Sequence, residues 1–352
     1  MISIGSSSFY GCSGLTSITI PSSVTSIGRS AFYGCSGLTS ITLPSSLTSI
    51  GDGAFNGCSG LTSITIPSSV TSIGMSAFYS CSGLTSINVS DSNPKYSSVD
   101  GMLCNKDQTK LIAVPNGKTS SIILPSSLTS IGSSAFEGCS GLTSITLPSS
   151  VRSIEFNAFR GCSGLTSITL PSSLTSIGNS AFRDCSGLTS ITLPSSLKSI
   201  GDWAFFNCSG LTSITLPSSL TSIGERTFVN CRGLTSITLP SSLTSIGSYA
   251  FYGCSGLTSI TLPSSLKSIG SYAFDDCKLF PLYILGKQLK LDAYTFKGLN
   301  SLSVIIAYNT EFEAIRRSWK HSLRNIEAPY FISVNEANLC NMSFRIVLNE
   351  YA

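Results

Sequence analysis

The sequence of 352 residues is only 11% charged, well below the quarter that is usual in globular domains, and Ser and Thr take the place of the missing charge. Its net charge of +4 is carried by scattered Lys and Arg residues, which argues against a nucleic-acid partner because such binding needs clustered positive charge. No apolar run reaches the roughly 18 residues of a membrane-spanning helix, so we expect no membrane span.

The N-terminal residues carry no recognisable targeting signal. Met1–Gly5 lacks both the basic start and the continuous apolar stretch of a signal peptide. Residues 4–12 match the second half of the repeat unit that fills most of the chain, so the sequence opens within a unit. A fragment or a truncated gene product would show this pattern.

One 23-residue unit recurs along residues 1–327, and its copy at 38–60 reads LTSITLPSSLTSIGDGAFNGCSG. Each unit contains a line of apolar residues that it cannot bury alone, which predicts a solenoid of stacked repeats. The unit starts at Leu15, Leu38, Leu61, Leu84, Leu142, Leu165, Leu188, Leu211, Leu234 and Leu257, with further starts at Thr119, Phe280 and Leu302.

Each unit is expected to contain one strand and one short helical turn. Residues 38–43 alternate apolar and polar side chains, which predicts a strand with its Ser and Thr side chains on the outer surface. Pro44 ends the strand, and Gly51 and Gly60 are expected to provide tight turns. The spacing of Ala54, Phe55 and Cys58 in the segment between those glycines predicts a helical or 3-10 turn.

The hydroxyl groups of the strands form a ladder, of which Ser144, Thr146, Ser167 and Thr169 are members. A solvated strand face is one interpretation. A groove that hydrogen-bonds a glycan or an extended peptide is another, and an ice-binding face is a third that a curved sheet would disfavour.

One repeat is stretched to 35 residues by an insertion at 88–118, which predicts a hairpin with its turn at Asn105–Gln108. The hydroxyl ladder is interrupted on either side of it, at Asn88 and Ile123. These two residues, with Tyr96 and Lys106 of the insertion, are therefore candidate ligand contacts. A loop that packs only its own side chains is the alternative.

Cysteines recur at the 23-residue spacing, from Cys12 to Cys81 and from Cys139 to Cys277. One thiol per repeat makes a line, whereas a metal site needs ligands that converge, so we expect buried small side chains and no metal. His321 is the single histidine, and no catalytic set of residues and no cofactor motif is present. We therefore expect a chain that is not an enzyme.

The C-terminal part offers a second candidate surface and two terminal elements. Tyr249, Tyr252 and Tyr272 form a possible interaction strip. Apolar residues at 312, 315, 319 and 323 predict an amphipathic helix over 311–323 that closes the end of the core. Residues 328–352 leave the repeat, and 330–334 and 344–348 are candidate strands of a terminal hairpin.

The repeat unit closely resembles the BspA-like leucine-rich repeats of bacterial and protozoan surface proteins, and the inserted hairpin and closing helix resemble that family as well. The resemblance implies an α/β solenoid, a right-handed leucine-rich-repeat horseshoe with a parallel sheet on its concave face and short helical or 3-10 turns on its convex side. It also implies a secreted or cell-surface protein that adheres to host or microbial proteins, including matrix proteins such as fibronectin. A structural spacer that self-associates end to end is the alternative.

Overall fold

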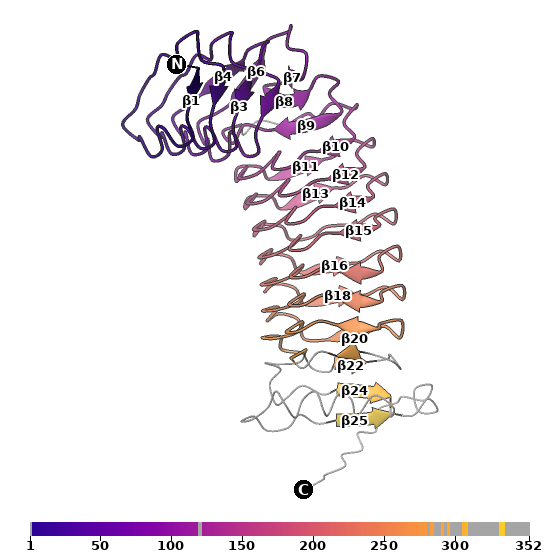
Figure 1. Ribbon diagram of the computed structural model, residues 1–352. Coiled ribbons are helices and arrows are strands. Elements are labelled where there is room, and N and C mark those ends of the chain that lie inside the picture. The colour runs from indigo at the N-terminus through magenta and orange to yellow at the C-terminus, as the bar shows by residue number, and fades with distance from the viewer. Residues whose placement is uncertain are drawn as a thin grey trace. The chain divides into compact units, whose positions relative to one another are not determined.

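The computed structural model describes residues 2–118, 122–279, 282–284, 290–291, 294–295, 305–308 and 331–334. The chain divides into two units, Met1–Gly187 and Leu188–Ala352, and each is a solenoid of stacked repeats built from parallel strands (Figure 1). None of the described residues lies in a helix. The predicted parallel repeat architecture is therefore confirmed, whereas the assignment to the α/β class is wrong.

The predicted strand of the repeat forms what we call the first ladder. In it, a strand pairs in parallel with the corresponding strand of a following repeat. Ile64 and Ile66 point inward while Ser63 and Thr65 are exposed, as the alternation predicts. Its strands are β4 (Ser63–Ile66), β6 (Ser86–Val89), β11 (Ser144–Thr146) and β13 (Ser167–Thr169) in the first unit, and β16 (Ser213–Thr215), β18 (Ser236–Thr238), β20 (Ile260–Leu262), β22 (Leu282–Ile284), β24 (Ile305–Tyr308) and β25 (Phe331–Val334) in the second.

In most repeats a second ladder runs along the Ser-Ile pair that precedes the glycine, and the sequence did not predict it. Two residues are too few to show the alternation that reveals a strand. Its strands are β1 (Ser3–Ile4), β2 (Ser26–Ile27), β3 (Ser49–Ile50), β5 (Ser72–Ile73), β10 (Ser130–Ile131), β12 (Ser153–Ile154) and β14 (Ser176–Ile177) in the first unit, and β15 (Ser199–Ile200), β17 (Ser222–Ile223), β19 (Ser245–Ile246), β21 (Ser268–Ile269) and β23 (Lys290–Leu291) in the second.

The Ala-Phe segment consists of consecutive turns, so the predicted helical or 3-10 turn is wrong. The amides of Ala54 and Cys58 donate within the segment, to the carbonyls of Gly51 and Phe55 at 3.2 and 3.1 Å. The amide of Phe55 instead donates to the carbonyl of Ala77 in the next repeat, at 2.9 Å. A helix directs every amide along its own axis. Here alternate amides join neighbouring repeats, and no helix can form.

The core contains two columns of identical side chains. Successive phenylalanine rings stack nearly parallel, with ring centroids from 4.7 Å apart (Phe136 and Phe159) to 5.9 Å apart (Phe55 and Phe78). Beside this phenylalanine column runs a cysteine column, in which most buried thiols donate to the phenylalanine carbonyl of the preceding repeat, as Cys58 does to Phe32 at 3.1 Å. The repeat therefore buries its Cys as a small side chain that also satisfies a backbone carbonyl.

The 35-residue repeat adds the antiparallel strands β7 (Tyr96–Val99), β8 (Met102–Asn105) and β9 (Lys110–Ala113). The connection between β8 and β9 coincides with the turn expected at 105–108. Strand β9 also pairs in parallel with β10, so the insertion continues the second ladder. Because Met102, Leu103 and Cys104 are fully buried, this hairpin is part of the core.

The C-terminal predictions are only partly covered by the described residues. Strand β25 coincides with the candidate strand at 330–334, but it pairs in parallel with β24 and extends the first ladder. The expected closing helix at 311–323, His321 and the candidate strand at 344–348 lie outside the described residues, as do residues 119–121 of the repeat that starts at Thr119.

Candidate functional site

Hydroxyl groups at a few recurring positions of the repeat bind backbone carbonyls of the preceding repeat. Ser46 Oγ donates to the carbonyl of Val24 at 2.7 Å, and Thr48 Oγ1 donates to that of Thr25 at 2.9 Å. Equivalent Ser and Thr bonds recur in both units. Bonds between repeats therefore explain part of the Ser and Thr enrichment.

The outer hydroxyls of the first ladder form the exposed strand face that alternation predicts. Ser144 pairs in register with Ser167, and Thr146 with Thr169, and all four side chains are exposed. This regular face is available to solvent or to a ligand.

The four candidate residues around the insertion lie in different surroundings. Tyr96 is half-buried, and its hydroxyl accepts a bond from the Ile73 amide at 3.1 Å, while burial raises its pKa. Lys106 Nζ donates to the carbonyl of Asp91 at 3.0 Å. Tyr96 and Lys106 thus bind the hairpin to Ile73 and Asp91. The other two candidates are at the surface, since Asn88 is exposed on β6 and Ile123 is 73% exposed.

Most thiols of the cysteine column are buried. Burial raises the pKa values of Cys81, Cys139 and Cys231 to about 12, and that of Cys104 in the inserted hairpin to about 11. Among the described residues, no group of three His, Cys, Asp or Glu side chains converges on a point that could hold a metal ion. Cys12 differs from the rest because it is exposed.

We expect the native chain to lose stability above pH ~8.5, the ordinary pKa of a thiol. Cys81, Cys104, Cys139 and Cys231 ionise there in the unfolded chain but stay protonated in the native one. The stability present below pH ~8.5 is therefore lost progressively as pH rises towards their native pKa values of about 11 to 12. Urea unfolding between pH 7 and 10 measures this loss.

In a Cys340→Ser variant at pH 8, a thiol reagent should modify Cys12 rapidly and the other thiols only on unfolding; rapid modification of several thiols would contradict the burial.

A groove of about 550 Å³ lies in the second unit, and we call it the aromatic groove. Along one wall the guanidinium of Arg226 lies between the rings of Trp203 and Tyr249, 4.7 Å from each centroid. The stack continues from Tyr249 to Tyr272 at 4.9 Å and from Tyr272 to Tyr294 at 5.2 Å. The remaining lining residues are Phe206, Val229, Asn230, Tyr252 and Asp275.

The predicted strip of Tyr249, Tyr252 and Tyr272 is therefore brought together in one groove, with the Tyr252 ring tilted against Tyr249 at 5.9 Å. Arg226 was missed as a member. It could have been found from spacing alone, because Trp203, Arg226, Tyr249 and Tyr272 follow one another at the repeat length and so occupy one position in successive repeats.

That position has a left-handed backbone in both units. In the first unit it is occupied by small residues: Ser7, Ser30, Gly53, Ser76, Ser134, Asn157 and Ser180. In the second unit Trp203, Arg226, Tyr249 and Tyr272 have φ between 54° and 61°. A residue other than Gly in this conformation costs on the order of 1–3 kcal/mol, so the strain belongs to the repeat in both units and only the size of the side chain differs.

Comparisons with known proteins give a consistent family. The model of the BspA type leucine-rich repeat region matches residues 1–105, 113–235 and 221–344. Among curated protein sequences, none matches the chain. The described residues contain no helix of the length and hydropathy that crossing a bilayer requires.

Three solved structures show the same fold. A leucine-rich repeat protein from Eubacterium ventriosum is 29% identical over 79% of this chain and 80% of its own, with a TM-score of 0.60. One from Bacteroides ovatus is 28% identical over 95% and 88%, with a TM-score of 0.58. The pneumococcal vaccine antigen PcpA, 24% identical over 95% and 71% with a TM-score of 0.60, resembles the chain in fold. The chain therefore belongs to the family of BspA-type leucine-rich-repeat proteins.

Proposed function

We propose that the chain is a non-catalytic recognition or adhesion scaffold, located at a cell surface or secreted, that binds host or microbial proteins through its solenoid. The observation that carries the proposal is the row of large side chains in left-handed backbone along the aromatic groove. The same position holds Ser, Asn or Gly in the first unit, so the fold does not require Trp, Arg or Tyr there. A binding role accounts for the choice of these large side chains.

The composition of the aromatic groove favours a protein ligand. Trp, Tyr and Arg are the residues that contribute most to protein–protein binding energy. The rings of Tyr249 and Tyr272 cover each other's faces at 4.9 Å, so the groove presents ring edges more than the open ring faces on which a sugar would stack.

The length of the groove suits a short extended segment. Three repeat spacings separate Trp203 from Tyr272, which is roughly 14 Å at about 4.8 Å per spacing. An extended chain covers that length with about four residues, at roughly 3.3 Å each. We therefore expect the ligand to lay an extended segment across successive repeats.

We expect Trp203→Ser and Tyr249→Ser to weaken saturable binding to an immobilised matrix protein such as fibronectin by at least about tenfold. Both substitutions install a residue that the first unit already carries at this position, so the variants should remain folded. Solid-phase binding of the full chain at several concentrations measures the effect. Tyr33→Ser is the matched control, because Tyr33 is an exposed aromatic residue that stacks on Tyr10 in the first unit and lies outside the aromatic groove.

The same measurements separate the alternatives. Saturable binding to immobilised glycans but to no protein would replace the protein ligand with a carbohydrate. Concentration-dependent self-association in sedimentation, without binding to any ligand, would instead support the structural spacer. Equal protein binding by the wild type and both groove variants would overturn the role of the aromatic groove.

A further inference from the structure

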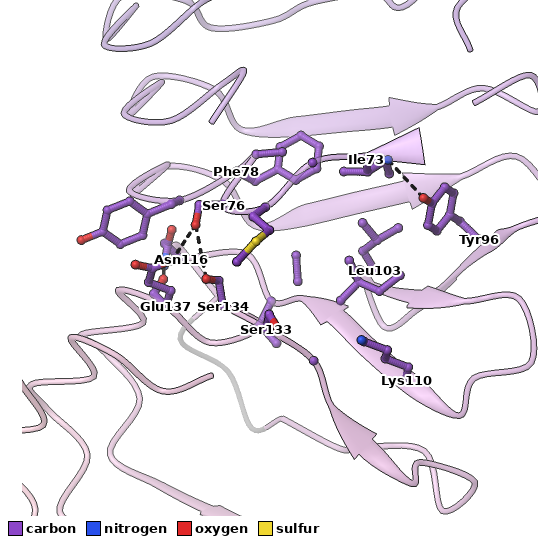
Figure 2. A pocket seen from close by; sticks show the side chains of 18 residues that line it. Ile73, Ser76, Phe78, Tyr96, Leu103, Lys110, Asn116, Ser133, Ser134 and Glu137 are labelled. Carbon is purple, nitrogen blue, oxygen red and sulfur yellow. Dashed lines mark hydrogen bonds between the residues drawn. The ribbon is translucent and has the colours of Figure 1, made fainter. Parts of the chain in front are cut away.

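The first unit contains a cavity of about 290 Å³ beside the inserted hairpin, separate from the aromatic groove (Figure 2). Its apolar wall includes Ile73, Phe78, Leu103 and Ile112. Met75, which is 49% exposed, also lines it, so the cavity has an entrance at the surface.

The cavity occurs where the phenylalanine column is interrupted. Val114 occupies the place of the phenylalanine, because its amide donates to Ala135 at 2.7 Å just as the amide of Phe136 donates to Ala158 at 2.7 Å. Likewise, Cys139 Sγ donates to the Val114 carbonyl, as Cys162 Sγ does to that of Phe136. One ring is thus missing from the column, and the smaller valine leaves the space unfilled.

Asn116 is among the residues that line the cavity, and its side-chain oxygen is a buried hydrogen-bond acceptor without a donor among the described residues. Asn116 Nδ2 donates to the Glu137 carbonyl at 2.8 Å, but the buried Asn116 Oδ1 has no hydrogen-bond partner within the described part of the chain. The nearby Glu137 carboxylate is already occupied, since it accepts a bond from Ser76 Oγ at 2.7 Å and pairs with Arg160 at 3.1 Å. A buried unpaired acceptor is unfavourable unless a donor reaches it.

We propose that this cavity binds a small, flat, two-ring aromatic molecule that carries a single N–H or O–H donor. The rings take the place of the missing phenylalanine beside Phe78, and the donor binds Asn116 Oδ1. The size follows from the volume, because an apolar cavity of about 150 Å³ accommodates benzene and this one is about twice as large. This site does not depend on the protein-binding role of the aromatic groove.

The probes are indole and indene, which have nearly the same shape and differ in the N–H donor. We expect indole to bind the full chain with one site, and indene to bind roughly tenfold more weakly because it leaves the Asn116 acceptor unpaired. Titration calorimetry measures both affinities. Equal affinities, or no binding of indole, would overturn the proposal.

Val114→Phe restores the missing ring, and we expect it to abolish indole binding while the melting temperature holds or rises. Ala113→Leu narrows the cavity from a second wall residue and replaces Val114→Phe if that variant does not fold. Arg29→Phe is the control, because it adds a ring at an exposed position away from the cavity and should leave indole affinity unchanged. Undiminished indole binding in a folded cavity-filling variant would place the ligand elsewhere.

Discussion

Replacing Phe159 by Ala is expected to lower the free energy of unfolding by about 3–5 kcal/mol, the range for truncating a fully buried aromatic side chain. The Phe159 ring lies between two others, 4.7 Å from Phe136 and 5.2 Å from Phe182, so its loss leaves both neighbours without a stacking partner on one side. The space left by the Phe159 ring cannot close easily, because backbone hydrogen bonds hold adjacent repeats at a fixed spacing.

Urea unfolding followed by circular dichroism measures this change, and Tyr33→Ala is the matched control. Tyr33 also stacks on an aromatic ring, that of Tyr10 at 4.7 Å, but it is 36% exposed and should change stability by less than about 1 kcal/mol. If both variants lose the same small amount, the stacked rings do not stabilise the solenoid as we infer.

Gly60→Ala is expected to destabilise the chain by about 1–3 kcal/mol, the usual range for overpacking a tightly packed site. A Cβ atom at Gly60 would lie 2.6 Å from the carbonyl oxygen of Ser36 in the preceding repeat, and backbone cannot move aside as a flexible side chain can. Gly60 has no left-handed φ, so the tight turn predicted from the sequence does not explain it. The glycine is instead explained by the close approach of the preceding repeat.

Gly14→Ala provides a control at the same position of the repeat, because a Cβ atom there meets nothing within 4 Å. We expect this variant to match the wild type in thermal unfolding, while Gly60→Ala melts at a lower temperature. A similar loss in both variants would point to backbone flexibility as the cause and would exclude the clash.

The sequence was sufficient to predict features that every repeat shares. The apolar positions, the inward cysteines and the parallel stacking follow from the constant repeat length and a single alternating segment. The second ladder and the turns around Phe55 were not predictable in this way. They depend on which amides bond to the next repeat, and the pattern of side chains within one repeat does not reveal that.

The candidate sites show the same limit. The tyrosines of the aromatic groove were apparent as departures from the repeat, and the 23-residue spacing that places Arg226 beside them was also present in the sequence. The cavity at Val114 could not be predicted from the sequence, because the alignment of Val114 with phenylalanine passes through an insertion. Only the hydrogen bonds to Ala135 and Cys139 establish the equivalence.

The hydroxyl and thiol bonds between repeats have a consequence for how such a chain can change length. Ser46, Thr48 and Cys58 each bind a carbonyl that any neighbouring repeat offers at the same place, 22, 23 or 26 residues earlier. Gain or loss of one whole unit by recombination between near-identical coding repeats therefore recreates every bond at the junction. The bonds of the core therefore favour no particular number of repeats. Selection can set the length of the solenoid by the ligand that its variable surface residues contact.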